Sequence, residues 1–262
     1  MRPSATAVCE RHRLLRERVQ DALVVSKTLE PLPSLAVILP ALRRAHGAEE
    51  AYLQRSAWAL RRELRPAEVL VFGDARPAGL AMRELEGLPV RFKQRPEHKE
   101  LQRPESLRRA FGDPLEKVLW RSRLVLDFVS AVKELDAPGA HVLWLEDDVE
   151  LLPGFGTLLE GWLQEHGRKK DWLCLQLLGF QRDTDPKTWT WGTRGWGGGG
   201  SLLYNAAWLP RYREFLAASF DKAPLDWLHK MMPTEGKEWW QPKLQPVLLK
   251  HFGEHSSHED FL

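Results

Sequence analysis

The sequence predicts an α/β protein built on a Rossmann-like, mostly parallel sheet with helices on both faces. Short continuous apolar runs such as LAVILP at residues 35–40 and EVLVFGD at 68–74 are typical of strands that are covered on both faces. Segments with helical periodicity separate these runs, and such alternation favours a parallel sheet. With 262 residues, the chain is long enough to bury one large core.

The segment 1–32 is predicted to be an N-terminal helical segment. Leucine, valine and alanine recur on one side of it, as they do in an amphipathic helix. Pro31 and Pro33 end the helix, because proline lacks the N–H that the next hydrogen bond would need. The remainder, 33–262, is predicted to form a single domain.

The first part of this domain alternates strands and helices. After the strand at 35–40, a helical pattern covers 48–65, and the apolar strand at 68–74 ends in Gly-Asp. VRF at 90–92 predicts a third, short strand. The polar, proline-containing stretch 94–106 predicts a loop.

The middle of the domain repeats the pattern. A helix at about 114–135 precedes HVLWLEDD at 141–148, which predicts a strand that ends in acidic residues. Pro153 begins another helix, since proline fits the first turn. The apolar run DWLCLQLL at 171–178 predicts the next strand.

The last part begins with an irregular loop at 181–200, which is rich in Trp, Thr, Gly and Asp. SLLYN at 201–205 predicts a strand. Helical patterns follow at 207–219 and 224–231, and VLLKHFG at 247–253 predicts the last strand.

Composition excludes several classes of protein. The formal net charge is +2, so no overall field indicates a nucleic-acid partner. Cys9 and Cys174 are the only cysteines, and they form no disulfide framework. No apolar run approaches the roughly 18 residues that span a membrane. We therefore expect a cytoplasmic protein as written, or a lumenal one if the chain is the trimmed part of a larger protein.

Three adjacent carboxylates, Glu146, Asp147 and Asp148, follow the buried run at 142–145. Along a strand, Glu146 and Asp148 would share one side and Asp147 would take the other. Carboxylate oxygens are the ligands that Mn²⁺ or Mg²⁺ prefers, and such an ion can also hold a nucleotide diphosphate. The alternative is that Asp147 or Asp148 caps a turn. Because ligands bind at the carboxyl ends of parallel strands, Asp74 is expected near the same crevice.

Other features lie late in the chain. The glycine run in GWGGGGSLLYN, residues 195–205, either lets the backbone approach a ligand closely or forms a flexible loop. Asp226 lies near the start of a helix, where N-capping is the usual explanation. In HFGEHSS, residues 251–257, an imidazole can ligate Mn²⁺ and the hydroxyls of Ser256 and Ser257 suit phosphate.

The order of these motifs resembles the GT-A glycosyltransferases, and more closely the N-acetylglucosaminyltransferase IV family that branches N-glycans. The similar stretches are PSLAVILPALRR (33–44), WRSRLVLDF (120–128), VLWLEDDV (142–149), PLDWL (224–228) and HFGEHSS (251–257). In the second of them, Arg121, Arg123 and Asp127 match the family's Arg-x-Lys-x-x-x-Asp helix. The run GWGGGGS departs from the family, in which a bulkier apolar stretch stands at this place.

The resemblance implies a GT-A catalytic domain that moves N-acetylglucosamine from UDP-GlcNAc to a glycan hydroxyl, with inversion and with a divalent metal. It implies that Asp148 holds the metal and that His251 is a second metal or phosphate contact. Glu146 and Asp147 would position the ribose, a metal-bound water or the donor sugar. Asp226 would be the general base.

The resemblance further implies that Arg121 and Arg123 face the diphosphate. The tryptophans at 189, 191, 196, 239 and 240 are candidates for an acceptor platform, with core packing as the alternative for Trp239 and Trp240. The expected partners are a UDP-sugar donor and a glycan acceptor.

Two alternatives stay open from the sequence. One is a glycosyltransferase with another donor such as UDP-GalNAc, and the other is a catalytically silent nucleotide-sugar-binding domain. A sugar-nucleotide-forming nucleotidyltransferase is disfavoured, because no glycine-rich loop with Lys or Arg follows the first strand.

Overall fold

The computed structural model describes residues 32–41, 49–74, 79–108, 112–177, 201–232, 244 and 247–251. Almost all of the predicted N-terminal helical segment, residues 1–31, and the loop 181–200 lie outside the described residues. Every strand that the sequence predicts within the described ranges is present, although most are shorter than predicted.

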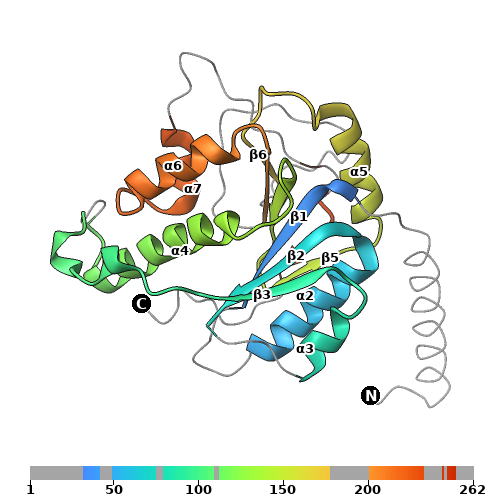
Figure 1. The fold of residues 1–262 in the computed structure, drawn as a ribbon, viewed down its shortest axis with the longest axis horizontal. Coiled ribbons are helices and arrows are strands. Elements are labelled where there is room, and N and C mark those ends of the chain that lie inside the picture. The colour runs from blue at the N-terminus through green and yellow to red at the C-terminus, as the bar shows by residue number, and fades with distance from the viewer. Residues whose placement is uncertain are drawn as a thin grey trace, which may run out of the picture.

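The core of the fold is a six-stranded mixed sheet (Figure 1). Its strand order is β3-β2-β1-β4-β7-β6. The four strands from β3 to β4 are parallel, whereas β7 runs antiparallel to both β4 and β6. The strands are β1 (Leu32–Ala41), β2 (Pro66–Gly73), β3 (Val90–Gln94), β4 (His141–Trp144), β6 (Cys174–Gln176) and β7 (Leu202–Tyr204).

Two short strands form a second sheet. β5 (Val149–Leu151) and β8 (Leu249–His251) pair antiparallel. The sequence predicts β8, which lies within the longer run VLLKHFG, but it does not predict β5, whose three residues stand between the acidic residues and Pro153 and belong to no such run. This small sheet packs on the same face as α2 (Glu49–Glu63), and the apolar residues of β5 belong to the core beneath that helix.

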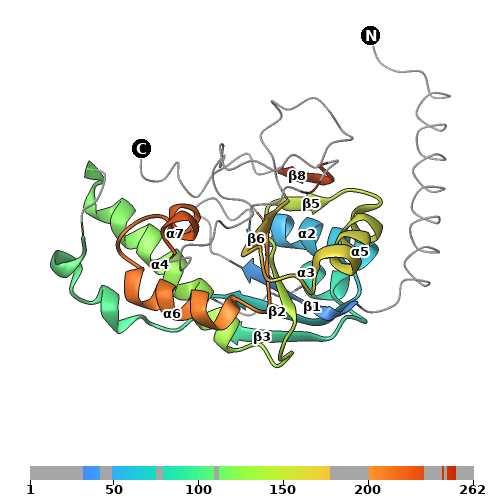
Figure 2. The same ribbon diagram turned by 90° about the horizontal axis from the view of Figure 1, so that it is seen from above.

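Helices cover both faces of the large sheet, as predicted. α2, α3 (Gly79–Glu84) and α5 (Phe155–His166) lie on one face, and α4 (Leu115–Lys133), α6 (Leu209–Ser219) and α7 (Leu225–Met231) lie on the other. Figure 2 separates the two groups of helices. The predicted fold class, an α/β Rossmann-like sheet that is mostly parallel, is confirmed.

β1 shows why this arrangement suits its sequence. Leu35, Val37 and Leu39 pack into the core under α2, whereas Ile38 packs into the core under α4. Successive residues of a strand point to opposite faces, so a continuous apolar run is required when both faces are covered. All of LAVILP is buried.

The loop predicted at 94–106 contains two short 3₁₀ turns, Lys99–Leu101 and Pro104–Ser106. The helix α3 is not predicted, because its six residues are too few for a helical period to be visible. Among the described residues, no helix is both long and apolar enough to cross a membrane.

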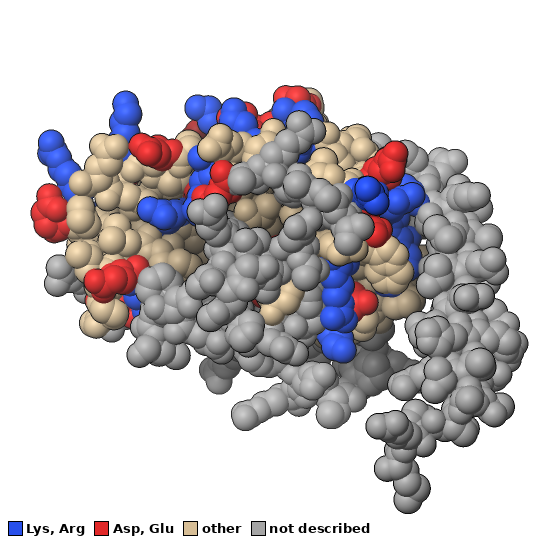
Figure 3. All heavy atoms as spheres, turned by 90° about the horizontal axis from the view of Figure 1, so that it is seen from below, with Lys and Arg blue, Asp and Glu red and all other residues tan. Residues whose placement is uncertain are grey.

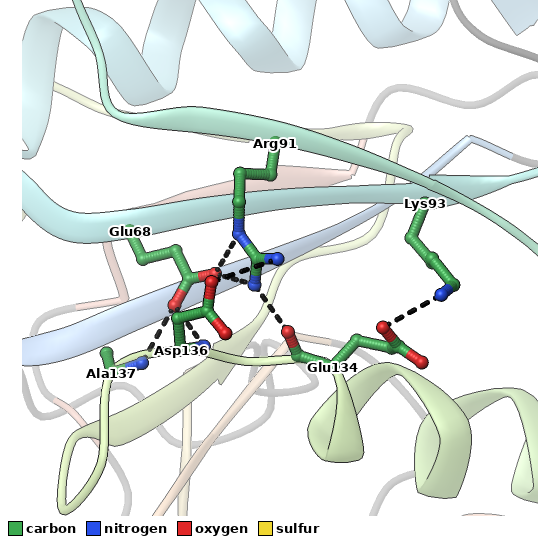
Figure 4. A network of polar contacts seen from close by, with 6 residues as sticks. All are labelled: Glu68, Arg91, Lys93, Glu134, Asp136 and Ala137. Atoms are coloured by element: carbon green, nitrogen blue, oxygen red, sulfur yellow. Dashed lines mark hydrogen bonds and ion pairs between the residues drawn. The ribbon is translucent and has the colours of Figure 1, made fainter.

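A buried carboxylate joins the amino ends of two strands to the loop that precedes β4 (Figure 4). Glu68 on β2 accepts hydrogen bonds from the Arg91 side chain and from the backbone N–H groups of Asp136 (2.8 Å) and Ala137 (3.0 Å). Arg91 also donates to the carbonyl oxygen of Glu134, just after α4. Glu68 therefore stabilises the edge of the sheet that lies opposite the predicted site.

Charge on one face of the molecule is mixed. In the space-filling view of Figure 3, Lys and Arg side chains alternate with Asp and Glu side chains on that face, and neither sign gathers into a large patch. This distribution agrees with the small formal net charge of +2.

Candidate active site

The three adjacent acidic residues lie in a turn that joins β4 to β5. β4 ends at Trp144, and the backbone N–H of Val149 donates to the carbonyl oxygen of Glu146 (3.3 Å). The prediction that the strand continues through Asp148, with alternating sides, is therefore wrong. The neighbouring strand β7 begins opposite Trp144, at Leu202, so among the described residues the chain beyond Trp144 has no strand partner on that side.

Two serines hold the backbone of this acidic turn. The hydroxyl of Ser56, on α2, is fully buried and donates towards the carbonyl oxygens of Asp147 (2.6 Å) and Val149 (2.7 Å). On the other side, the N–H of Glu146 donates to the hydroxyl of Ser201 (3.2 Å). The path of the turn is thus fixed by elements that are distant in sequence.

Two carboxylates of the turn are buried. Asp147 is 3% exposed and Asp148 is 6% exposed, whereas Glu146 is partly exposed. Burying a carboxylate costs free energy unless nearby positive charge or hydrogen bonds offset its negative charge. The negative charge of the next acidic residue, Glu150, is offset by Arg55, whose Nη2 atom lies 2.5 Å from the Oε2 atom of Glu150.

The small sheet brings His251 to the acidic turn. In the β5–β8 pair, His251 lies opposite Val149, the residue that follows Asp148. The backbones of the two predicted metal ligands therefore meet, although they are far apart in the sequence. The structure describes the side chain of Asp148 but not that of His251. An oxygen donor and an imidazole nitrogen form a donor set that suits Mn²⁺.

The parallel strands end at a common edge, as predicted. Gly73 of β2 pairs with Ala41 of β1, and Trp144 of β4 pairs with Ile38 of the same strand. A Cβ atom on Gly73 would lie 2.2 Å from the carbonyl oxygen of Ala41, so this strand end has room only for glycine. Asp74 therefore lies at the same edge of the sheet as the acidic turn.

A charged network surrounds this edge on the β3 side. Asp127 of α4, 2% exposed, contacts Arg95 (3.2 Å) and the Nε2 atom of His98 (2.7 Å). Arg95 also pairs with Asp74. The network links the end of β2, the chain just after β3 and the middle of α4, so it fixes these three elements relative to one another.

The two arginines predicted to face the diphosphate differ in their surroundings. Arg121 is 1% exposed, and its guanidinium group pairs with Asp113 and donates to the carbonyl oxygen of Arg108 (3.4 Å). Arg123 is exposed. Of the pair, only Arg123 presents its side chain to solvent.

The predicted base, Asp226, lies in the first turn of α7. Pro224 occupies the N-cap position, so the backbone of Asp226 is inside the helix and the N-cap explanation does not apply. The helix is held to the sheet by His229, whose Nε2 atom lies 3.0 Å from the hydroxyl of Tyr204 on β7. The side chain of Asp226 is outside the described part of the structure.

Several predicted features lie outside the described residues. Among them are Ser256 and Ser257, most of the glycine run at 195–205, and the five tryptophans proposed as an acceptor platform. Among the described side chains, no group of three or more His, Cys, Asp or Glu residues is placed to hold a metal ion. The described side chains include that of Asp148 but not that of His251.

The sequence interpretation missed Ser56, Arg95 and His98. The sequence could have indicated Ser56, because it is the one polar residue between Leu53 and Leu60 on the buried face of α2. Arg95 and His98 lie in a segment with no periodicity, so only their contacts in the folded chain reveal them.

Comparison with known proteins confirms the resemblance that the motifs indicate. No family model matches the chain. A 167-residue region is 25% identical to the alpha-1,3-mannosyl-glycoprotein 4-beta-N-acetylglucosaminyltransferase B of Danio rerio, and the human protein of that name matches with the same identity. The match covers 58% of this chain but only 27% of each relative. The chain thus matches about a quarter of the length of these relatives.

Among solved structures, the fold is similar to that of a 4-diphosphocytidyl-2C-methyl-D-erythritol synthase from Anaerococcus prevotii. The TM-score is 0.51 at 11% sequence identity, over 87% of this chain and 92% of that chain. This likeness concerns the fold alone.

Proposed function

We propose that this chain is the catalytic domain of a glycosyltransferase that moves a sugar from a nucleotide-sugar donor to a hydroxyl of a glycan. The observation that supports the proposal is the pairing of β5 with β8, which brings the backbone of His251 close to that of Asp148 beside the acidic turn. The similarity to N-acetylglucosaminyltransferases supports UDP-GlcNAc as the donor and inversion as the outcome.

The residues of the turn fit a divalent cation, Mn²⁺ or Mg²⁺. Asp148 and His251 would hold it, and Glu146 and Asp147 would position the ribose or the donor sugar. A bound cation supplies positive charge that stabilises the departing diphosphate. Arg121 and Arg123 on α4 are proposed to add to this charge, and Ser256 and Ser257 are proposed as phosphate contacts.

Inversion requires a single displacement. The acceptor hydroxyl oxygen attacks the anomeric carbon, the bond from that carbon to the diphosphate oxygen breaks, and the nucleotide leaves with the electron pair. A base must take the hydroxyl proton and must therefore lie within hydrogen-bond reach of it. We assign this role to Asp226 on α7, a helix that the contact between His229 and Tyr204 holds against the sheet.

Titration calorimetry tests the metal site. UDP should bind the wild-type protein with Mn²⁺ present and much more weakly with a chelator, and Asp148→Ala should remove this difference. Glu150→Ala is the matched control: it removes a nearby carboxylate that pairs with Arg55 and should leave the metal dependence intact. Equal UDP affinity of the wild type with and without metal would contradict the proposed metal dependence.

A donor screen separates the remaining alternatives. Hydrolysis and transfer should be measured with UDP-GlcNAc, UDP-GalNAc and other UDP sugars, each with and without Mn²⁺. Turnover with UDP-GalNAc and with no other sugar would mean that the donor is UDP-GalNAc and that the type of reaction is as proposed. Binding of UDP sugars without any turnover would identify a silent binding domain instead.

A further inference from the structure

The short strand β5 lies between β8 and the helix α2 (Figure 2). One edge of β5 pairs with β8, and the other edge faces α2. A two-stranded sheet is marginally stable by itself, and packing against a helix is one way in which it is stabilised. The contacts between α2 and β5 therefore affect how firmly the acidic turn, which runs directly into β5, is held in place.

Side chains of α2 take the place of a third strand along the second edge of β5. The carbonyl groups of alternate residues in a strand point to the same edge. The carbonyl oxygen of Val149 accepts a hydrogen bond from the Ser56 hydroxyl (2.7 Å), and that of Leu151 accepts one from the guanidinium group of Arg62. The hydrogen bonds that a neighbouring strand would supply thus come from the helix.

Arg62 belongs to an ion pair that is largely buried. Its Nε atom lies 2.6 Å from the Oε1 atom of Glu63, and the two side chains are only 11% and 9% exposed. The guanidinium group also lies over the ring of Trp58, 4.5 Å from its centroid. The Oε2 atom of Glu63 accepts a hydrogen bond from the backbone N–H of Gly154 (2.8 Å). The pair therefore contacts the backbone on either side of the point where β5 ends.

The chain beyond β5 packs directly on the backbone of α2. A Cβ atom on Gly156 would lie 1.9 Å from the carbonyl oxygen of Glu63, so only glycine allows this close approach. Ser56 contacts the beginning of β5 from a position about two helical turns before Glu63. The helix thus holds β5 at both of its ends.

We propose that Arg62 and Glu63 are positioning residues for the acidic turn. They fix β5 against α2, and β5 in turn sets the place of Asp148 and of the strand β8. A buried ion pair seldom adds more stability than well-packed apolar residues of the same size, whereas the planar guanidinium group binds two acceptors in a fixed geometry. This inference rests on the proposed function, because its effect is exerted on the divalent cation that Asp148 and His251 would hold.

Binding of Mn²⁺ alone, followed by the electron paramagnetic resonance signal of the free ion, tests the inference without any turnover. Arg62→Lys keeps a positive charge beside Glu63, but an ammonium group lacks the fork that contacts Glu63 and Leu151 together. This variant should bind Mn²⁺ about three- to tenfold more weakly than wild type. Arg62→Ala should lose at least as much. Glu63→Gln should lose less, because it keeps an acceptor for the N–H of Gly154.

The matched control is Arg91→Ala. Arg91 also pairs with a buried glutamate, Glu68, and donates to a backbone carbonyl oxygen, that of Glu134, but it lies at the opposite edge of the sheet from the acidic turn. This variant should keep an affinity for Mn²⁺ within about twofold of wild type. Thermal unfolding of all variants identifies any that fail to fold, and Arg62→Lys decides the test if Arg62→Ala does not fold.

Amide hydrogen exchange of the metal-free protein separates this inference from the proposed function. Peptides that cover 146–154 should exchange about tenfold faster in Arg62→Lys than in wild type, because the local opening of β5 costs less free energy. Peptides from β2 should exchange as in wild type.

The outcomes differ for the two proposals. If wild type binds Mn²⁺ and Arg62→Lys keeps the same affinity, the positioning role is wrong while the proposed function stands. If wild type binds no Mn²⁺, the proposed metal site is wrong, and the exchange of 146–154 decides the inference. Equal exchange in wild type and Arg62→Lys overturns it, and faster exchange in the variant supports it.

Discussion

Val149 and His251 lie opposite each other in the small β5–β8 sheet, and this pairing brings the backbones of the two predicted metal ligands close together. Asp148 precedes Val149 in the chain, so the end of the acidic turn and the C-terminal strand share one edge. The contact joins segments that no local pattern relates. It also means that the geometry of the turn depends on groups outside it.

Ser56→Ala should destabilise the acidic turn. The buried Ser56 hydroxyl donates towards the carbonyl oxygens of Asp147 and Val149. Leaving such buried acceptors without their donor costs about 1–3 kcal/mol in the free energy of unfolding. Denaturant unfolding should show this decrease in the free energy of unfolding, and calorimetry should show weaker Mn²⁺-dependent UDP binding.

The control for Ser56 is Ser122→Ala. Ser122 is also fully buried, but its hydroxyl finds no hydrogen-bond partner within the part of the chain that the structure describes. This variant should be nearly neutral in both measurements. Equal effects of the two substitutions would argue against a role for Ser56 in holding the turn.

Asp226→Asn should stop transfer without weakening UDP binding. Removal of a general base typically lowers the rate by about 10²–10⁴-fold, and the amide cannot accept the proton of the hydroxyl. Single-turnover rates and UDP calorimetry measure the two effects separately. Asp221→Asn, which makes the same change in the loop before α7, should keep near-normal turnover; wild-type turnover in Asp226→Asn would exclude it as the base.

Asp127→Ala should lower stability strongly. It would leave Arg95 and His98 without their shared carboxylate, and removal of one partner from a buried pair costs about 3–5 kcal/mol. We expect the lower end of that range, because the side chain of Arg95 is still 18% exposed.

Chemical denaturation measures the effect of Asp127→Ala on the free energy of unfolding. Asp136→Ala is its control, because the Asp136 side chain is 77% exposed and its pair with Arg91 should contribute at most about 1 kcal/mol. Similar losses in both variants would show that the network at the carboxyl edge is no more important than a surface ion pair.

Stability should fall below about pH 6.5. Burial lowers the pKa of His141 below its usual value of 6.5, and the Nδ1 atom accepts a hydrogen bond from the N–H of Ala206 (3.2 Å). Below pH 6.5 the unfolded chain therefore binds a proton that the folded chain does not. The free energy of unfolding is then constant above this pH and decreases as the pH falls toward the lower folded-state pKa.

The pH dependence can be measured by urea denaturation between pH 5 and 8. Each such histidine contributes at most about 1.4 kcal/mol per pH unit. Burial also lowers the pKa of His166, so His141→Asn should reduce the slope without abolishing it. Asparagine keeps an acceptor near the Nδ1 position. If the free energy of unfolding of this variant changes with pH as steeply as that of wild type, His141 does not cause the loss of stability at low pH.

The sequence by itself determined the class of fold and the edge at which the candidate site lies. LAVILP and EVLVFG could be recognised because a strand buried on both faces must be apolar throughout, and β1 and β2 are such strands. The rule that parallel strands present their carboxyl ends together then placed Asp74 near the acidic turn.

Only the tertiary structure decided how the site is held. It showed that Glu146 to Asp148 form a turn rather than a strand end, that Ser56 holds this turn, and that β8 pairs with β5. The contacts of Ser56 and of the β5–β8 pair join residues far apart in the chain, and β5 is too short to show a period. Local patterns report which face of an element is buried, whereas pairing between distant segments depends on the packing of the whole sheet.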